Sequence, residues 1–423
     1  MKKRLLTFLL IFVVSFALAG CAALKDNVYF SDAPVPTPAK IESTFSNKDE
    51  EKSEQTVLTR QTMPDGLELV LYSDGKLYVS GADVSNNIKT GNVAKNYGAK
   101  VVSIEFGEGV TKIADQAFSG LFTLQAIYMG PDLKEIGAYA FSNCTGITEI
   151  NFGENLEIIG DYAFDGCESL KNAILGDHLK KIGYSIFNGC ENLTTLRINS
   201  NISSHAFRDL EALQSVSCGE NVTVIGSYAF YGCPKLKTLS WPSVETIEEF
   251  AFYGCESMVD LNLDKSVKTI GTSAFSGCEN LLRIYIPANV DTVGSYCFAN
   301  DINLTSVILE KSNAEEGEDR QRTLGNSVFS GCEALKEVNI AEGYTSIGDY
   351  AFADCENLYS LVIPHSMKKI GYGFISNDEN LKSLEYHGNG YDWGKIRTTM
   401  SGTFKDAEIY GPTYYVTDWK KLE

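Results

Sequence analysis

A phenylalanine recurs along the chain at nearly constant spacing, and this repeat constrains the fold more than any other feature. Successive members lie 23, 23, 23, 20, 23, 22, 23, 23, 31, 23 and 22 residues apart. A unit of this length cannot bury its own apolar side chains, whereas stacked units align equivalent side chains into columns. The spacing predicts one stack of repeats, not the two or three globular domains that length suggests. The members are Phe118, Phe141, Phe164, Phe187, Phe207, Phe230, Phe252, Phe275, Phe298, Phe329, Phe352 and Phe374.

Each anchor Phe, here position 0, lies in a recurring pattern. Ile-Gly precedes it at −5 and −4, as in Ile136 and Gly137, with Ala at −1, Cys at +3 and Leu at +6. An apolar pair follows at +9 and +11, as in Ile284 and Ile286, and its period of two indicates a strand. Gly or Asn at +2, as in Gly166, suits a left-handed turn.

This pattern, over roughly residues 110–386, resembles the BspA-type leucine-rich repeat of bacterial surface lipoproteins. The resemblance implies a right-handed solenoid of about twelve repeats of about 23 residues. It also implies one parallel β-sheet on the concave face, with short turns, 3-10 or helical segments opposite. The function it implies is binding of an extracellular protein or glycan, as in adhesion, although a fold alone does not fix a function.

Two irregularities interrupt the period. The spacing of 31 residues after Phe298 indicates a charged insertion at about 310–322. This insertion is a second candidate binding site, and the alternative is a surface loop without a function. The spacing of 20 residues after Phe187 removes the Ile-Gly step, which predicts a kink in the stack.

The N-terminus indicates export. Basic residues at 2–4 precede an uncharged apolar run at 5–18, typical of a secretory signal. Residues 18–21 (Leu-Ala-Gly-Cys) resemble a lipobox, so we expect a signal peptide at 1–20 and lipidation of Cys21. The alternative is a plain signal anchor, but the run is short for a membrane span. We therefore expect the protein on the bacterial cell envelope, outside the cytoplasmic membrane, with membrane contact through the lipid only.

The flanking segments complete the predicted organisation. Residues 21–56 are rich in Pro, Ser, Lys and Glu, which predicts a disordered tether. Residues 57–109 form an N-terminal capping region whose alternating apolar residues at 67–81 predict a hairpin. The solenoid would occupy 110–386, and 387–423 resembles an aromatic C-terminal cap.

The chain is strongly acidic. Its 36 Lys and Arg against 55 Asp and Glu give a net charge of −19, and loss of Lys2, Lys3 and Arg4 on cleavage would make it −22. Such a surface repels phosphate, so nucleic acid is not an expected partner. We expect a monomer.

Cysteines occupy one position of the repeat. Because small thiols pack well in cores, we expect a buried, reduced column, with disulfides between neighbouring rungs as the alternative. Cys218 and Cys297 are also expected in the core, and no zinc-type spacing occurs, so neither a metal nor a cofactor is expected. The position +3 cysteines are Cys144, Cys167, Cys190, Cys233, Cys255, Cys278, Cys332 and Cys355, with Leu121, Leu210, Asp301 and Asn377 elsewhere.

Catalytic patterns are absent from the sequence. The four histidines, His178, His205, His365 and His387, are scattered over different repeat positions. His205 lies at −2, which is often Tyr, so it is interpreted as an aromatic substitute. We expect no catalytic residues and no enzyme.

The remaining candidate site is the exposed side of the strands. Positions +8 and +10 point away from the core pair at +9 and +11. Exposed apolar and Arg side chains at these positions favour a ligand-binding face over a face that is merely exposed to solvent. The alternative functions are a structural spacer and, less favoured, an extracellular hydrolase. The candidate residues are Tyr128, Asn151, Ile174, Arg197, Asn262, Arg283, Tyr285, Ile308, Asn339 and Val362.

Overall fold

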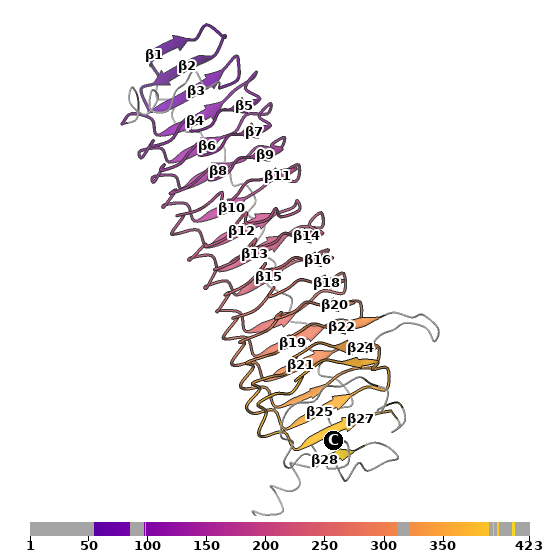
Figure 1. Ribbon diagram of the computed structural model, residues 1–423. Coiled ribbons are helices and arrows are strands. Elements are labelled where there is room, and N and C mark those ends of the chain that lie inside the picture. The colour runs from indigo at the N-terminus through magenta and orange to yellow at the C-terminus, as the bar shows by residue number, and fades with distance from the viewer. Residues whose placement is uncertain are drawn as a thin grey trace, which may run out of the picture. The chain divides into compact units, whose positions relative to one another are not determined.

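The computed structural model describes residues 55–84, 97, 99–311, 321–388, 392 and 396, and the backbone of 408–410. The chain divides into two compact units, Met1–Ser53 and Glu54–Glu423, and the described residues all belong to the second. This unit is a β-solenoid of stacked turns (Figure 1). Within the described part, no helix has the length and apolarity needed to cross a bilayer.

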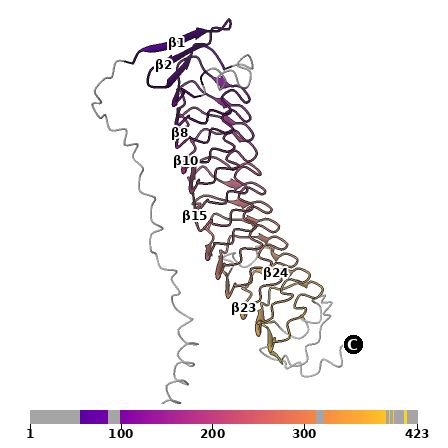
Figure 2. The same ribbon diagram turned by 90° about the vertical axis from the view of Figure 1, so that its left-hand side faces the viewer.

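Each turn contributes one strand to a parallel ladder, here the wide sheet, formed by positions +8 to +11. The ladder runs along one side of the stack (Figure 2) and is hydrogen-bonded in three segments, with breaks between β8 and β10 and between β15 and β17. Its strands are β4 (Ser103–Phe106), β6 (Ala126–Tyr128), β8 (Glu149–Asn151), β10 (Asn172–Ile174), β12 (Thr195–Ile198), β13 (Ser215–Cys218), β15 (Thr238–Ser240), β17 (Asp260–Asn262), β19 (Arg283–Ile286), β21 (Ser306–Leu309), β23 (Glu337–Asn339), β25 (Ser360–Ile363) and β27 (Ser383–Tyr386).

The predicted hairpin lies at the N-terminal end of the wide sheet. β2 (Glu68–Tyr72) pairs antiparallel with β3 (Lys76–Ser80), and β1 (Val57–Thr62) adds an outer antiparallel strand. β3 then pairs in parallel with β4, which begins the ladder. At the other end, β28 (Glu408–Tyr410) pairs in parallel with β27.

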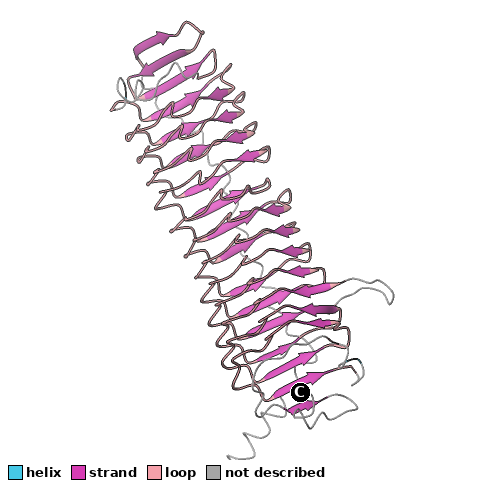
Figure 3. Cartoon of the chain, in the orientation of Figure 1, coloured by secondary structure: helices cyan, strands magenta, loops and turns pink. Residues whose placement is uncertain are grey.

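A second, narrow sheet runs opposite the wide one, where the sequence predicts only turns or short helical segments (Figure 3). In most turns its strands have two residues, an exposed or half-buried one at −6 and a buried Ile or Val at −5. Such strands are too short to show a period of two in a sequence. They are β5 (Lys112–Ile113), β7 (Glu135–Ile136), β9 (Ile158–Ile159), β11 (Lys181–Ile182), β14 (Val224–Ile225), β16 (Thr246–Ile247), β18 (Thr269–Ile270), β20 (Thr292–Val293), β22 (Arg322–Leu324), β24 (Tyr344–Ile347) and β26 (Lys369–Ile370).

The anchor phenylalanines form the central column of the core. The anchors from Phe118 to Phe352 are fully buried, and consecutive rings stack, for example at 5.2 Å between the centroids of Phe252 and Phe275, except that Phe164 and Phe187 are tilted by 30°. The largest separation is 6.3 Å, between Phe187 and Phe207, where three residues are missing from the repeat. The predicted register of these anchors is therefore confirmed.

Two positions of each turn have left-handed backbone. At +2, Gly166 and Asn143 have φ of 67° and 57°, as the sequence predicts. At −2, residues with a side chain adopt the same conformation, including Tyr162 at 54° and Ser273 at 51°. This second position was not predicted, because Tyr and Ser do not signal a left-handed residue.

The left-handed positions turn alternate N–H groups toward the following turn. Phe118 N–H donates to the Ala140 carbonyl at 2.8 Å, and Gly120 N–H donates to the Ser142 carbonyl at 2.7 Å. The same bonds recur along the stack except before the short repeat, where the Ile186 N–H donates to the Ala206 carbonyl at 3.1 Å. The turns that carry the anchors are therefore hydrogen-bonded to one another, as the strands of the two sheets are.

The last repeat has a different register from the one predicted. Phe374 lies at −1, where its carbonyl accepts the N–H of the preceding anchor at 2.7 Å, and Ile375 takes position 0. Gly373 and Asn377, with φ of 56° and 67°, then occupy −2 and +2. Position +3 therefore belongs to Asp378, not Asn377.

The short repeat between Phe187 and Phe207 was predicted to lack the residues at −5 and −4, but the structure retains both positions. Ile202 is buried at −5 and forms a bridge with Ile225, while Ser203 stands in place of Gly. Ile182 N–H donates to the Ser203 hydroxyl at 3.2 Å, and the narrow sheet is interrupted between β11 and β14. The structural change at the short repeat is therefore a break in the narrow sheet. The kink in the stack that the sequence predicts at this place stays a prediction.

The cysteines at position +3 form a buried and reduced column, as predicted. All ten cysteines of the described region are buried and free of disulfides. At +3 each thiol donates to the anchor carbonyl of the preceding turn, as from Cys144 Sγ to Phe118 O at 3.2 Å. Burial raises the pKa of the Cys144 thiol to about 12, so the reactive thiolate is disfavoured.

Candidate ligand-binding face

Five of the predicted face residues form one uninterrupted column on the C-terminal segment of the wide sheet. Asn262, Tyr285, Ile308, Asn339 and Val362 pair directly, strand to strand, from β17 to β25. Their side chains point out of the sheet and are exposed or half-buried. Because parallel strands lie about 4.8 Å apart, the column spans four steps, or roughly 19 Å.

The other candidates lie on the same side of the wide sheet but on different segments. Tyr128 pairs with Asn151 on β6 and β8, and Ile174 pairs with Arg197 on β10 and β12. The break between β8 and β10 separates these two pairs, and the break between β15 and β17 separates both from the five-residue column. The structure thus brings six of the ten predicted residues together in one hydrogen-bonded segment, the five of the column and Arg283.

Arg283, the remaining candidate, lies beside this column at position +8. Its Nε and Nη2 donate to the Asp260 carboxylate at 2.6 and 2.7 Å, a bidentate ion pair. The bond from Arg283 holds the pKa of Asp260 below its usual value. Both side chains are exposed, so the pair adds little stability, but it fixes the guanidinium plane on the face.

Tyr285 is also held in place. Burial, followed by a hydrogen bond to the Glu310 carboxylate, raises the pKa of its phenol. Glu310 Oε2 also accepts the N–H of Ala288 at 2.9 Å. The ring therefore stands on the face in a fixed orientation, which lowers the entropy lost when a ligand binds.

The predicted insertion at 310–322 is shorter than its charges suggested. Arg322 is fully buried, and its guanidinium donates to the Glu310 carbonyl at 2.7 Å and the Val290 carbonyl at 2.9 Å. It also lies 4.1 Å from the centre of the Tyr344 ring. Both ends of the predicted insertion thus belong to the solenoid, and residues 312–320 lie outside the described part.

A hollow of about 420 Å³ opens where the column meets the C-terminal ends of β21 and β23. Two face residues, Ile308 and Asn339, help to line it. Most of its surface is apolar, and its lining includes the buried residues Val307, Leu309, Ile340 and Pro364. Sequence reasoning missed it, because no periodic signal marks a concavity formed by the ends of separate turns. The one sequence signal near the hollow was the long spacing after Phe298, which marks the turn that contributes β21.

The histidines do not form a reactive cluster. His205 stacks between Tyr184 and Tyr228, with ring centroids at 5.0 and 4.7 Å, which confirms its interpretation as an aromatic substitute. Burial, then Arg208, lowers the pKa of His205. Among the described residues, no group of three or more His, Cys, Asp or Glu side chains is arranged to hold a metal ion.

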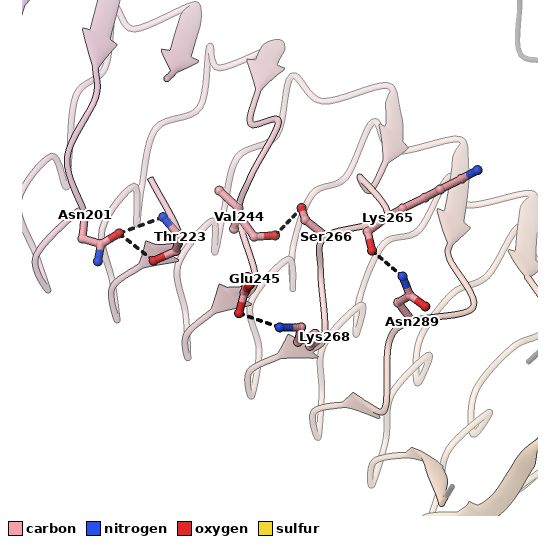
Figure 4. Close-up of polar contacts among 8 residues, drawn as sticks. All are labelled: Asn201, Thr223, Val244, Glu245, Lys265, Ser266, Lys268 and Asn289. Carbon is pink, nitrogen blue, oxygen red and sulfur yellow. Dashed lines mark hydrogen bonds and ion pairs between the residues drawn. The ribbon is translucent and has the colours of Figure 1, made fainter. Parts of the chain in front are cut away.

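Side-chain clamps tie successive turns together away from the face (Figure 4). Asn201 Oδ1 accepts from the N–H and the hydroxyl of Thr223 at 2.8 and 3.1 Å. Two turns further on, Lys268 donates to Glu245 at 2.7 Å. These contacts keep the turns in register, and hence the spacing of the face residues.

Several predicted features lie outside the described residues. These are the signal peptide at 1–20, the lipidation site Cys21, the tether except its last two residues, and most of the cap at 387–423.

Comparison with known proteins bears on the whole stack. A family model described as BspA type leucine rich repeat region (6 copies) matches residues 92–204, 200–319 and 315–409. No curated protein matches the chain. A leucine-rich repeat protein from Bacteroides ovatus is 22% identical with a TM-score of 0.52, over 84% of this chain and 100% of that one, which shows a shared fold. A leucine rich cell surface protein from Faecalibacterium prausnitzii is 25% identical with a TM-score of 0.42, over 82% of this chain and 99% of that one.

Proposed function

The chain belongs to the family of BspA-type leucine-rich-repeat proteins, and from that premise we propose that it is a cell-surface binding protein. Its partner is an extracellular protein or glycan that lies on the exposed side of the wide sheet. The repeat fold serves as a scaffold for recognition, and the chemistry of that face decides what is recognised.

The observation that carries this proposal is the column from Asn262 to Val362. Five side chains of mixed chemistry follow one another in strict register, flanked by the oriented guanidinium of Arg283. Aromatic and Arg side chains dominate most binding surfaces, and Tyr285 and Arg283 supply both on one strand. A structural spacer has no need to orient them.

The proposed location is the bacterial cell envelope, with Cys21 as the lipid anchor. Support comes from the basic and apolar N-terminus and the Leu-Ala-Gly-Cys sequence that ends it. Anchoring through lipid chains would leave the solenoid free on the outer side of the membrane.

The test is a double variant, Arg283→Ser with Tyr285→Ala, measured against any partner captured by the purified protein. We expect binding to weaken by about 10- to 100-fold, as for the loss of central interface residues. The matched control is Tyr296→Ala, which removes an equally large ring that is 50% exposed at position −2, outside the face. Equal affinity of the double variant and the wild type would contradict the proposal.

A deletion separates the face from the inserted segment. Removal of residues 312–320 spares Glu310 and Arg322, which the solenoid needs. Retained binding in the deletion and lost binding in the double variant support the face. The reverse places the site on the inserted segment, and no partner for any form, across protein and glycan panels, favours a spacer.

A further inference from the structure

The hollow beside the five-residue column differs from the rest of the wide-sheet face. Elsewhere the face presents mainly polar side chains at positions +8 and +10, such as Thr195, Ser217 and Thr238. Here the exposed face residue of β21 is Ile308. It lies beside a hollow of about 420 Å³ that is also lined by the buried residues Val307 and Leu309 of the same strand, and by Ile340 and Pro364, which follow the strands of the next two turns. This size lies in the range of ordinary ligand pockets, and apolar walls with few polar groups are typical of them.

Most charged groups around the hollow already have partners. The two oxygens of Glu342 accept the N–H groups of His365 at 2.9 Å and Ser366 at 3.1 Å. His387 Nε2 lies 3.1 Å from Glu385 Oε1. Glu342 therefore shapes the rim by holding the backbone of the next turn.

Two polar lining groups remain available. Lys311 is exposed, and its ammonium has no hydrogen bond or ion pair with any other described residue. The Asn339 amide is likewise exposed and makes no side-chain hydrogen bond within the described part. An ammonium at the mouth of an apolar hollow, on a chain of net charge −19, attracts a carboxylate, while an amide can pair with a peptide group.

We propose that this hollow is the anchoring pocket for a protein partner, which inserts one large apolar side chain and places a neighbouring carboxylate against Lys311. The partner segment then continues along the column through Asn339, Ile308 and Tyr285. The inference rests on the proposed function and deepens it, because it selects a polypeptide over a glycan. A sugar presents hydroxyl groups, which apolar walls would leave without hydrogen bonds.

The probes are acetylated, amidated hexapeptides with a central Trp-Glu, Trp-Lys or Ala-Glu pair among Gly and Ser. Binding to the full chain in detergent is measured by saturation-transfer NMR, which detects the millimolar affinity expected of a single anchor. We expect the strongest transfer to the indole of the Trp-Glu peptide, less with Trp-Lys, and none with Ala-Glu or cellohexaose.

Two pairs of matched variants locate the binding. Ala341→Trp fills the hollow, whereas Asp264→Trp places the same ring at the same repeat position, +12, away from it. Lys311→Glu reverses the free charge, whereas Lys265→Glu reverses a lysine at the same position, +13, elsewhere. We expect Ala341→Trp to reduce transfer about fivefold or more and Lys311→Glu to invert the peptide preference, with both controls like the wild type.

Some outcomes would overturn the inference. These are equal transfer in Ala341→Trp and the wild type, a wild-type preference for Trp-Lys, or transfer to cellohexaose that Ala341→Trp abolishes. The proposed function can still be judged separately. If a captured partner is lost by the Arg283 and Tyr285 double variant but kept by Ala341→Trp, the face binds and the anchoring pocket does not.

Discussion

At the residue scale, two carboxyl groups interrupt the column of thiols. Asp301 is fully buried at +3, where its Oδ1 accepts the Cys278 N–H at 2.8 Å and its Oδ2 has no partner among the described residues. Burial raises the pKa of Asp301 well above its usual value, and raises that of Asp378, the equivalent residue of the last turn, to about 8. The protein therefore holds these groups as neutral acids over a wide pH range.

We predict that Asp301→Asn stabilises the protein at neutral pH and has little effect near pH 4. Asn keeps the oxygen that accepts the Cys278 N–H but cannot ionise. In the wild type the folded pKa lies above the unfolded value of about 3.9, so the unfolded chain loses its proton first and stability falls as pH rises above about 4. Thermal melting at pH 4, 6 and 8 should show a gap that widens with pH. Asp264→Asn, at an exposed position, is the control, and a gap of constant size would contradict the prediction.

At the element scale, the glycine at −4 lets the narrow sheet stack closely. A Cβ on Gly271 would lie 2.5 Å from backbone atoms of both Glu248 and Glu249 in the preceding turn. The glycine at +2 has a different reason. A Cβ on Gly254 would meet nothing within 4 Å, and only its φ of 70° disfavours a side chain. One residue type thus meets two separate constraints in each turn.

These constraints predict different costs for the same substitution. Gly271→Ala should lower the free energy of unfolding by about 3 kcal/mol, because backbone atoms must move apart. Gly254→Ala should lower it by about 1 kcal/mol, the cost of a left-handed residue with a side chain. Denaturant unfolding of both variants checks the order. Equal losses would mean that close packing of the turns is not what requires Gly at −4.

Features that recur in every repeat could be predicted from the sequence. Features that depend on contacts between particular turns could not. The Phe column, the buried thiols and the candidate face follow from position within the repeat. The hollow and the buried state of Arg322 depend on tertiary contacts, and a charged residue near an insertion reads as solvated. The register of the last turn was wrong because Phe374, one place early, imitates an anchor that is in fact Ile375.

At the scale of the whole molecule, the proposed function of a cell-surface binding protein requires that the solenoid be held at a membrane. We predict that Cys21→Ser yields a chain without lipid that is released into the soluble fraction. Metabolic labelling with a fatty-acid analogue measures this, and Ala23→Ser, two residues away, should label normally. Labelling that persists in Cys21→Ser would rule out Cys21 as the lipidated residue.

The stacked turns also determine how such a chain can change over generations. Each turn offers its neighbour on one side a set of N–H donors, at −2, 0 and +2, and its neighbour on the other side the matching carbonyls. A gene that duplicates or loses one whole regular repeat therefore creates a junction with the same bonds as the other regular junctions. The length of the solenoid, and the number of strands in its wide sheet, can evolve by copying without redesign of the core.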